Sequence, residues 1–355
     1  MKTSAAAYPS IVLVRAEYLL LYLDWLRKLG TPVDRELRKA RLPTLIEELP
    51  DEYVSLNMSY RFLGNCARID GVDDIGFEAG WNVSFDAFGD IMASTLRAAP
   101  TPKLRLEVFA RLLALEDTGA HCEAHFEGDM SRISVHQYTP PGGDSRIAEW
   151  LNIKAIIEII RTWMGQNWMP PVIGLESRLP VLNSILNRLP GVQVLTGQSA
   201  PFIRVPNHIL TSPITYDSLA PTANGIDEPL GTPGSVVQAT GDIVEMLSTS
   251  LSPYLRSGYP QIDLAAEIAG ISVRSLQRQL GKMRISYTEL VERIRYGQAI
   301  RLLADPDLKI LEIALELGYG DASNFSRAFR RISGSSPREI RKHLVTDAES
   351  RGGVK

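Results

Sequence analysis

Two groups of residues in this sequence have the types and the spacing that a specific chemistry requires. The first is His121, Cys122 and His125, an H-C-x-x-H pattern of zinc-type ligands. If the segment is a strand, His121 and His125 share one face but lie roughly 13 Å apart along it, while Cys122 points to the opposite face. One ion needs every ligand within roughly 2.0–2.3 Å. We therefore interpret these residues as surface or core side chains and expect neither a metal nor a cofactor.

The second group lies in a degenerate repeat near the carboxyl end. Its first copy is IDLAAEIAGISVRSLQRQL, residues 262–280, and its second is ILEIALELGYGDASNFSRAF, residues 310–329. In each copy a small residue, Ala266 or Ala314, is followed four residues later by glycine and then by a polar segment. Arginine pairs with guanine, glutamine pairs with adenine, and serine accepts either. The side chains of the polar segments are therefore suited to reading base edges.

The turn and capping residues of each copy are typical of two short helices joined by a tight turn. The alanine lets the first helix cross close to the second. Gly270 and Gly318 adopt a left-handed backbone conformation at little cost, and Ser272 and Asp321 are N-cap residues that start the second helix. The second helix then has an apolar inner face formed by Leu276 and Leu280 in one copy and by Phe325 and Phe329 in the other.

The segment between the copies predicts a rigid spacer. Ser286 and Glu289 form a capping box that opens a helix from Tyr287 to about Ala304. Such a helix is roughly 25 Å long, and it can hold two recognition helices about one DNA turn, roughly 34 Å, apart. A further capping box, Ser336 with Glu339, opens a short closing helix.

These features resemble the AraC/XylS-type DNA-binding domain over about 85 residues, most specifically in ALELGYGDASNFSRAFRRISGSSPREIR. The resemblance implies that both recognition helices enter successive major grooves of double-stranded DNA. By position it implies base contacts from Arg274, Gln277 and Arg278 in the first helix and from Ala322, Ser323, Ser326 and Arg327 in the second. It implies phosphate contacts from Lys282, Arg330, Arg331 and Arg338. For Arg278 and Arg327, contact with a phosphate or an acidic neighbour is an equal alternative.

The remainder of the chain predicts an α+β domain over residues 1–215, a proline- and glycine-rich linker at 216–235, an all-α double helix-turn-helix domain at 236–344, and a flexible tail at 345–355. In the first domain we expect helices at 11–29, 58–69, 87–98, 104–115, 148–164 and 182–189. We expect strands at 121–127, 132–138, 170–175, 192–195, 202–205 and 208–210, the first two joined by a hairpin turn at Gly128-Asp129.

The first domain, from about Ala16 to Ile214, is similar to the arabinose-binding-like amino-terminal domain of the same regulator family. The stretches that carry this similarity are FEAGWNVSFDAFGDIMASTLRAAPTPKLRLEVFARLL, WMPPVIGL and PNHILTSPI. The similarity implies effector sensing, dimerisation or both. Trp150, Trp163 and Trp168 either pack in its core or line a ligand pocket.

We therefore expect a transcription activator that binds promoter DNA, responds to a small-molecule effector, forms a homodimer and contacts RNA polymerase. The alternative is a ligand-independent regulator whose first domain only dimerises or binds a protein partner. The sequence has no P-loop, no dinucleotide fingerprint and no clustered nucleophile and base, so we expect no catalytic residues and no enzyme activity.

Composition and charge agree with this interpretation. The chain has 355 residues, enough for two or three domains, and 45% hydrophobic with 22% charged residues is typical of a globular protein. Residues 259–344 contain 14 Lys and Arg against 10 Asp and Glu, a net charge of +4; since the whole chain carries −3, the rest carries −7. A basic end favours a polyanionic partner. Two cysteines, with neither a signal peptide nor a membrane span, fit a reducing cytosol. With the resemblance to DNA-binding regulators, we expect the bacterial cytoplasm and nucleoid.

Overall fold

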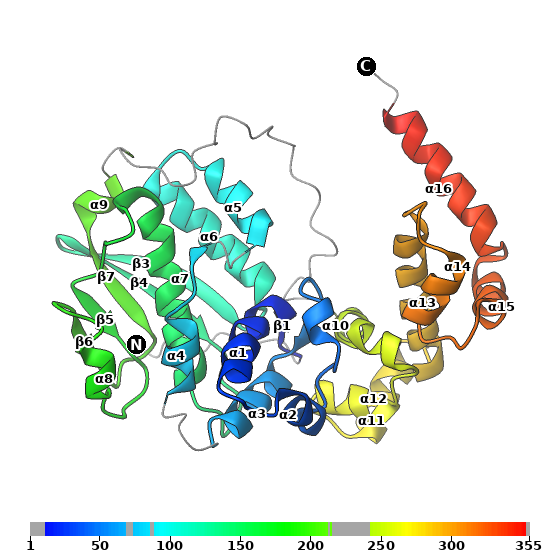
Figure 1. The fold of residues 1–355 in the computed structure, drawn as a ribbon, viewed down its shortest axis with the longest axis horizontal. Coiled ribbons are helices and arrows are strands. Elements are labelled where there is room, and N and C mark those ends of the chain that lie inside the picture. The colour runs from blue at the N-terminus through cyan, green and yellow to red at the C-terminus, as the bar shows by residue number, and fades with distance from the viewer. Residues whose placement is uncertain (1–10, 69–73, 86–88, 212–213, 215–241, 353–355) are drawn as a thin grey trace. The chain divides into compact units, whose positions relative to one another are not determined.

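The computed structural model of this chain describes residues 11–68, 74–85, 89–211, 214 and 242–352 (Figure 1). The chain divides into two compact units, residues 1–240 and residues 241–355. The linker expected at 216–235 lies outside the described residues. Among the helices that the structure describes, none has the length and the apolar character of a membrane-spanning segment.

The larger of two sheets in the amino-terminal unit has five strands. The strands are β3 (Ala120–Glu127), β4 (Met130–Gln137), β5 (Val172–Gly174), β6 (Gln193–Leu195) and β7 (Phe202–Pro206). Their order across the sheet is β3-β4-β7-β5-β6, and every neighbouring pair is antiparallel except β5 and β6. The strand segments expected at 121–127, 132–138, 170–175, 192–195 and 202–205 are therefore confirmed.

The hairpin of β3 and β4 has the two-residue turn that the sequence predicts. Gly128 has φ +63°, a conformation that favours glycine, and Glu127 pairs with Met130 across the turn. The same register pairs His121 with His136 at the far end of the hairpin. Ile133 and Val135 of β4 are fully buried, and β4 packs against α7 (Arg146–Met164). Residues that alternate with these two lie on the opposite face of the sheet.

Helices pack against the sheet and form most of the core of this unit (Figure 1). α7 is the central helix, and Ile153, Ile156, Ile157 and Ile160 on it are fully buried. Trp150 on the same helix is 1% exposed and lies edge-on to Phe77 and Trp81, so its role is core packing. The other helices are α1 (Ala16–Lys28), α2 (Val33–Ala40), α3 (Leu56–Cys66), α4 (Ile75–Gly80), α5 (Gly89–Arg97), α6 (Pro102–Glu116), α8 (Asn183–Leu186) and α9 (Asn207–Thr211).

Two sequence predictions in this unit are wrong in detail. The helix expected to begin at residue 11 begins at Ala16, because β1 (Leu13–Arg15) pairs with β2 (Tyr53–Ser55) about 40 positions away in the chain. The strand expected at 208–210 belongs instead to helix α9. Asn207 is anchored there by a hydrogen bond from its Nδ2 to the carbonyl of Gly128, at 2.8 Å, and the chain turns away from the sheet.

In the carboxyl-terminal unit, the described residues are almost wholly helical, as the sequence predicts. Its elements are α10 (Ile243–Leu251), η3 (Ser252–Ser257), α11 (Ile262–Ile268), α12 (Val273–Lys282), α13 (Tyr287–Leu303), α14 (Ile310–Glu316), α15 (Ala322–Ser333) and α16 (Pro337–Gly352). α16 is longer than the short closing helix that we expected to end at Leu344. Residues 345–351 contain no proline or glycine to stop it, so the helix replaces most of the expected tail at 345–355.

Candidate nucleic-acid interface

The first of the two candidate units consists of α11 and α12. Gly270, with φ +63°, ends α11, and the amide of Ile271 donates to the carbonyl of Ala266 at 3.0 Å. Ser272 then caps α12 by accepting the amide proton of Ser275 at 3.2 Å. Leu276 and Leu280 are at most 1% exposed. These buried leucines orient α12 so that the expected DNA-contacting residues are exposed, namely Arg274, Gln277, Arg278 and Lys282.

In the second unit, which consists of α14 and α15, the turn between the helices packs against η3. Gly318 has φ +73°, and a Cβ atom added there would lie 2.3 Å from the carbonyl oxygen of Leu255 in η3. Both the backbone conformation and the close approach therefore require glycine. An ion pair between Arg256 of η3 and Glu316 of α14, at 2.6 Å, holds the same two elements together.

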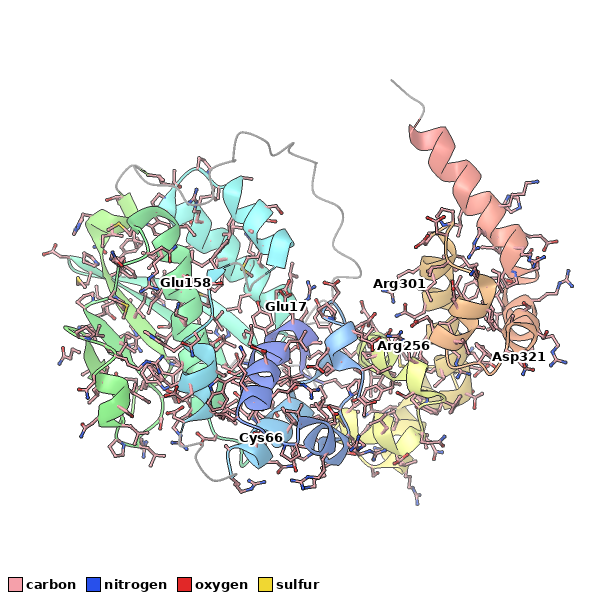
Figure 2. The ribbon with its side chains drawn as sticks, viewed as in Figure 1. Glu17, Cys66, Glu158, Arg256, Arg301 and Asp321 are labelled. Carbon is pink, nitrogen blue, oxygen red and sulfur yellow. The ribbon has the colours of Figure 1, made fainter. Side chains whose placement is uncertain are left out.

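α15 begins with a well-formed cap at Asp321, which is labelled in Figure 2. Its carboxylate accepts hydrogen bonds from the amide and the side chain of Asn324, each at 2.7 Å. Phe325 and Phe329 are at most 2% exposed. Of the residues expected to contact DNA from this unit, the structure exposes Ser323, Arg327, Arg330, Arg331 and Arg338, whereas Ala322 and Ser326 are half-buried.

Two arginines of α15 already have partners within the protein. The Arg327 guanidinium donates to Oδ1 of Asn324 at 2.6 Å. Arg331 forms an ion pair with Glu292 of α13. Glu292 is half-buried, so Arg331 is oriented by the spacer helix instead of extending freely into solvent.

The spacer helix α13 is built as the sequence predicts. Ser286 Oγ accepts the amide proton of Glu289 at 3.2 Å, and the Glu289 carboxylate accepts the amide proton of Ser286 at 2.7 Å. These hydrogen bonds lower the pKa of Glu289. The helix has 17 residues, which corresponds to roughly 25 Å.

Aromatic contacts fix the spacer to both units, and sequence reasoning did not identify these contacts. Tyr287 on α13 donates its hydroxyl proton to the carbonyl of Pro260 at 2.8 Å, just before α11. The Arg295 guanidinium lies 4.6 Å from the ring centre of Tyr319, beside α15, and 5.4 Å from that of Tyr259, before α11. The Tyr296 ring lies 5.3 Å from that of Phe329 on α15. The two recognition helices are therefore held at a fixed separation within this unit.

Two helix-turn-helix units on a rigid spacer define the carboxyl-terminal unit as a double helix-turn-helix DNA-binding domain. Comparison with family models agrees. Residues 265–343 match a helix-turn-helix domain, and residues 30–214 match the amino-terminal arabinose-binding domain of the AraC transcription regulator. The second match alone covers more than half of the chain. The chain belongs to the AraC family of transcription regulators.

Individual relatives show the same relationship. The regulator VirS of Mycobacterium tuberculosis is 25% identical over 333 residues, which are 93% of this chain and 97% of VirS. The activator RhaS of Enterobacter sp. is 38% identical over 82 residues, but these are only 22% of this chain and 29% of RhaS. The crystal structure of CdpR from Pseudomonas aeruginosa is similar over 88% of this chain and 96% of CdpR, with 19% identity and a TM-score of 0.35.

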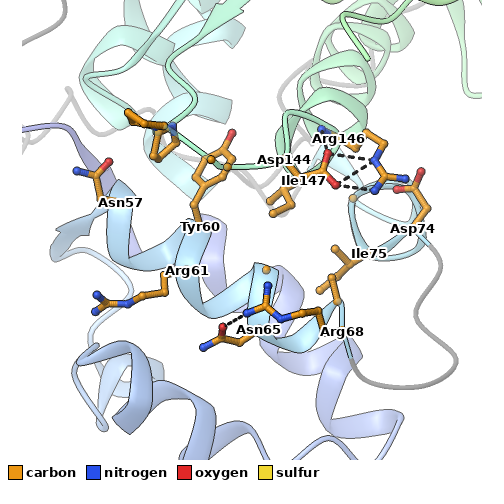
Figure 3. Close-up of a pocket in the computed structure, with 17 residues that line it drawn as sticks. Asn57, Tyr60, Arg61, Asn65, Arg68, Asp74, Ile75, Asp144, Arg146 and Ile147 are labelled. Atoms are coloured by element: carbon orange, nitrogen blue, oxygen red, sulfur yellow. Dashed lines mark hydrogen bonds and ion pairs between the residues drawn. The ribbon is translucent and has the colours of Figure 1, made fainter. Parts of the chain in front are cut away.

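The amino-terminal unit contains a polar cavity of about 650 Å³ between α3, the start of α4 and the loop before α7 (Figure 3). Five charged side chains line it: Arg61, Arg68, Asp74, Asp144 and Arg146. The Arg146 guanidinium is paired with Asp144, its Nε lying 3.0 Å from each carboxylate oxygen. These residues come from segments about 70 positions apart, so the sequence offered no local signal for them.

A smaller, mostly apolar cavity of about 60 Å³ adjoins the polar one, and Tyr60 and Ile147 line both. Asp117 lies in its wall and is 7% exposed. Burial raises the pKa of Asp117 to about 6, although Gln137 and the amide of Gly119 donate hydrogen bonds to its carboxylate. Asn57 lines the polar cavity, and its buried Oδ1 has no hydrogen-bond partner among the residues that the structure describes. The two cavities therefore place a mostly apolar lining beside a polar and charged one.

Proposed function

We propose that this AraC-family chain is a sequence-specific activator that binds promoter DNA through α12 and α15. The observation that carries the proposal is the matched geometry of the two units. Each recognition helix is capped by a side chain, anchored by two buried apolar residues and exposed on its polar face. The spacer α13 contacts both units, so two major grooves that lie one helical turn apart on a duplex can meet both polar faces together.

Base reading is expected mainly from α12, because its exposed side chains are long. Arg274, Gln277 and Arg278 can each make a bidentate contact with a base edge, worth about 1–3 kcal/mol. On α15 the corresponding positions are mostly small, namely Ala322, Ser323 and Ser326, with Arg327 beyond them. Lys282, Arg330, Arg331 and Arg338 are assigned to phosphates, which position the protein without reading sequence.

The experiment that tests the interface compares operator preference in matched arginine variants. Footprinting of the intact protein on genomic fragments first defines the operator. Arg278→Ala is expected to weaken binding about tenfold or more and to relax the preference at one base position. Arg301→Ala is the control, because Arg301 is also exposed but lies in the last turn of α13 (Figure 2). If both variants keep the wild-type affinity and motif, the assignment of Arg278 is wrong.

We further propose that a small polar effector occupies the cavity of Figure 3. Support comes from its three arginines and two aspartates, its unpaired Asn57 oxygen and its apolar neighbour, a combination that orients a ligand carrying both charge and hydrocarbon. A ligand switches the protein only if it binds two conformations with different affinity. In this proposal residues 1–215 also form the homodimer, residues 216–235 link them to the DNA-binding domain, and no part is catalytic.

Gly64 offers a direct test of the cavity. It lies on α3 in the cavity wall, and an added Cβ would meet no atom within 4 Å. Gly64→Leu should therefore fold, fill the space and abolish ligand-induced thermal stabilisation of the intact protein, whereas Gly64→Ala should retain it. The screen uses a panel of amino acids and sugars as probes. If stabilisation by an active ligand survives Gly64→Leu, the ligand binds elsewhere.

The activator role has a separate test. The relative RhaS is named an activator, and α14 exposes about half of the side chains of Leu311 and Leu315, which is consistent with contact to RNA polymerase. Transcription in vitro from the footprinted promoter should rise when the protein is added. Repression would contradict the activator role. Activation that no ligand of the panel changes, in the wild type and in Gly64→Leu alike, would favour the alternative of a ligand-independent regulator.

A further inference from the structure

Three side chains converge on the sheet face that points away from α7. His121 and Glu123 lie two residues apart on β3, so they share a face, and His136 is the direct cross-strand partner of His121. The two imidazole rings stack with centroids 4.6 Å apart and planes 6° from parallel. Glu123 Oε1 lies 2.7 Å from His136 Nε2. One ligand atom from each of the three residues lies within 4.8 Å of the others.

This set has the chemistry of a transition-metal site. Imidazole nitrogen and carboxylate oxygen bind Zn²⁺ at about 2.0–2.2 Å, and two histidines with one carboxylate leave a coordination position open. Ligand atoms already this close need only small side-chain rotations to meet one ion. The hairpin register fixes the two histidines opposite each other, so most of the ordering is complete before any ion binds.

Of the described residues near the site, Arg132, Cys122 and His125 neither block it nor replace its ligands. Arg132 shares this face, but its guanidinium lies 4.0 Å from the Phe202 ring centre, and its Nε donates to Ser134 at 3.3 Å. Cys122 is paired with Val135 on the opposite face of the hairpin, so its side chain lies away from the three ligands. His125 contacts Glu123 at 3.2 Å and helps to orient the carboxylate.

We propose that His121, Glu123 and His136 bind one divalent transition-metal ion of the Zn²⁺ class, which links the edge strand β3 to β4. This assignment differs from the H-C-x-x-H set in the sequence, because it exchanges Cys122 and His125 for two residues brought in by strand alternation and by the hairpin. The site belongs to the amino-terminal unit and does not depend on the proposed DNA contacts or on the effector cavity.

The test uses the full chain, purified without a histidine tag and stripped with a chelator. Zn²⁺ should bind with a stoichiometry of one per chain and raise the melting temperature, and Co²⁺ should give a visible d–d absorption band that Zn²⁺ displaces. His136→Gln and Glu123→Gln should each weaken Zn²⁺ binding about tenfold or more. Glu123→Gln preserves the shape of the side chain and serves if His136→Gln does not fold.

The controls are His208→Gln, an exposed histidine on α9, and Cys122→Ser. Both should bind Zn²⁺ as the wild type does. Failure of the wild-type chain to bind Zn²⁺, or unchanged affinity in Glu123→Gln, would overturn the proposal. Loss of binding in Cys122→Ser with retention in Glu123→Gln would overturn it as well, because that result assigns the site to the thiol.

Discussion

Gly318 combines two requirements that are usually met at different positions. Its backbone is left-handed, and its Cα faces the carbonyl of Leu255 so closely that a side chain cannot be placed between them. Gly320, two residues later, has neither restriction, since no atom lies within 4 Å of an added Cβ and its backbone is not left-handed. The pair therefore compares a glycine that both restrictions require with a glycine that neither restriction requires.

We predict that Gly318→Ala destabilises the carboxyl-terminal unit by about 1–2 kcal/mol from the left-handed backbone alone, with a further loss from the clash with η3. Urea unfolding of the intact protein, followed by the far-ultraviolet signal of its helices, measures the change. Gly320→Ala is the control and should shift the unfolding free energy by less than about 0.5 kcal/mol. Equal effects in the two variants would contradict the role given to the Leu255 contact.

The buried carboxyls beside the small cavity give stability a defined pH dependence. Burial raises the pKa of Asp117 to about 6 and, despite an opposing effect of Arg15, that of Glu116 to about 7, from ordinary values of 3.8 and 4.5. Between about pH 4 and pH 7 the folded state therefore binds more protons than the unfolded state. The contribution of these groups to stability is present below about pH 4 and is lost as the pH rises to about 7.

Asp117→Asn should remove the contribution of Asp117 to this change of the unfolding free energy with pH. We expect the unfolding free energy of the variant, relative to the wild type, to rise as the pH increases from 4 to 7. Urea unfolding at several pH values measures the difference between the two proteins, so that other carboxyls cancel. Parallel profiles for the two proteins would show that Asp117 is ionised normally in the folded state.

At the scale of elements, α13 determines how the two recognition helices relate to each other. Its first turn is fixed by the Ser286–Glu289 box and by the hydroxyl of Tyr287 on the Pro260 carbonyl. Its middle is fixed by the rings around Arg295 and Tyr296. Loosening the first turn therefore affects the first helix-turn-helix unit more than the second.

We predict that Ser286→Ala lowers the unfolding free energy by about 0.5–2 kcal/mol, because the amide of Glu289 loses its acceptor. The same variant should weaken protection of the half-site bound by α12 more than that of the half-site bound by α15 in a footprint. Thr288→Ala, an exposed neighbour in the same turn, is the control. Equal weakening of both half-sites would mean that the spacer moves as one body.

Elements marked by local signals could be predicted from the sequence, and those made by distant pairing could not. Ser272, Ser286 and Asp321 cap helices that begin where expected, because an N-cap acts on amides two or three residues away. β1 was predicted as helix, because its pairing with β2 is set by tertiary contacts alone. The two-residue turn at Gly128, which the sequence predicts, fixes the register of the whole hairpin and therefore pairs His121 with His136. The pair itself lies far from the turn and has no local signal of its own.

At the scale of the whole molecule, charge is divided unevenly along the chain. Residues 259–344 carry a net +4 and the rest carries −7. The basic residues assigned to phosphates lie on or beside both recognition helices, so binding should release several counterions from DNA at once. The acidic remainder limits adhesion of the rest of the chain to DNA.

We predict that operator affinity falls steeply and log-linearly with salt, with a slope of about −0.9 for each phosphate neutralised. Lys282→Ala should make the slope shallower by about one unit while leaving the binding motif unchanged. Fluorescence anisotropy across a salt titration measures both. An affinity independent of salt would exclude the phosphate contacts, and a changed motif would reassign Lys282 to a base.

The support that Gly318 receives from η3 sets a lower limit on any autonomous DNA-binding fragment. A fragment trimmed to the matched helix-turn-helix region, residues 265–343, discards Leu255, the Arg256 partner of Glu316, and the Pro260 carbonyl that accepts from Tyr287. Its second unit would be left without the surface on which its turn rests. Fragments meant for crystallisation with an operator should therefore start before Ile243, where α10 begins.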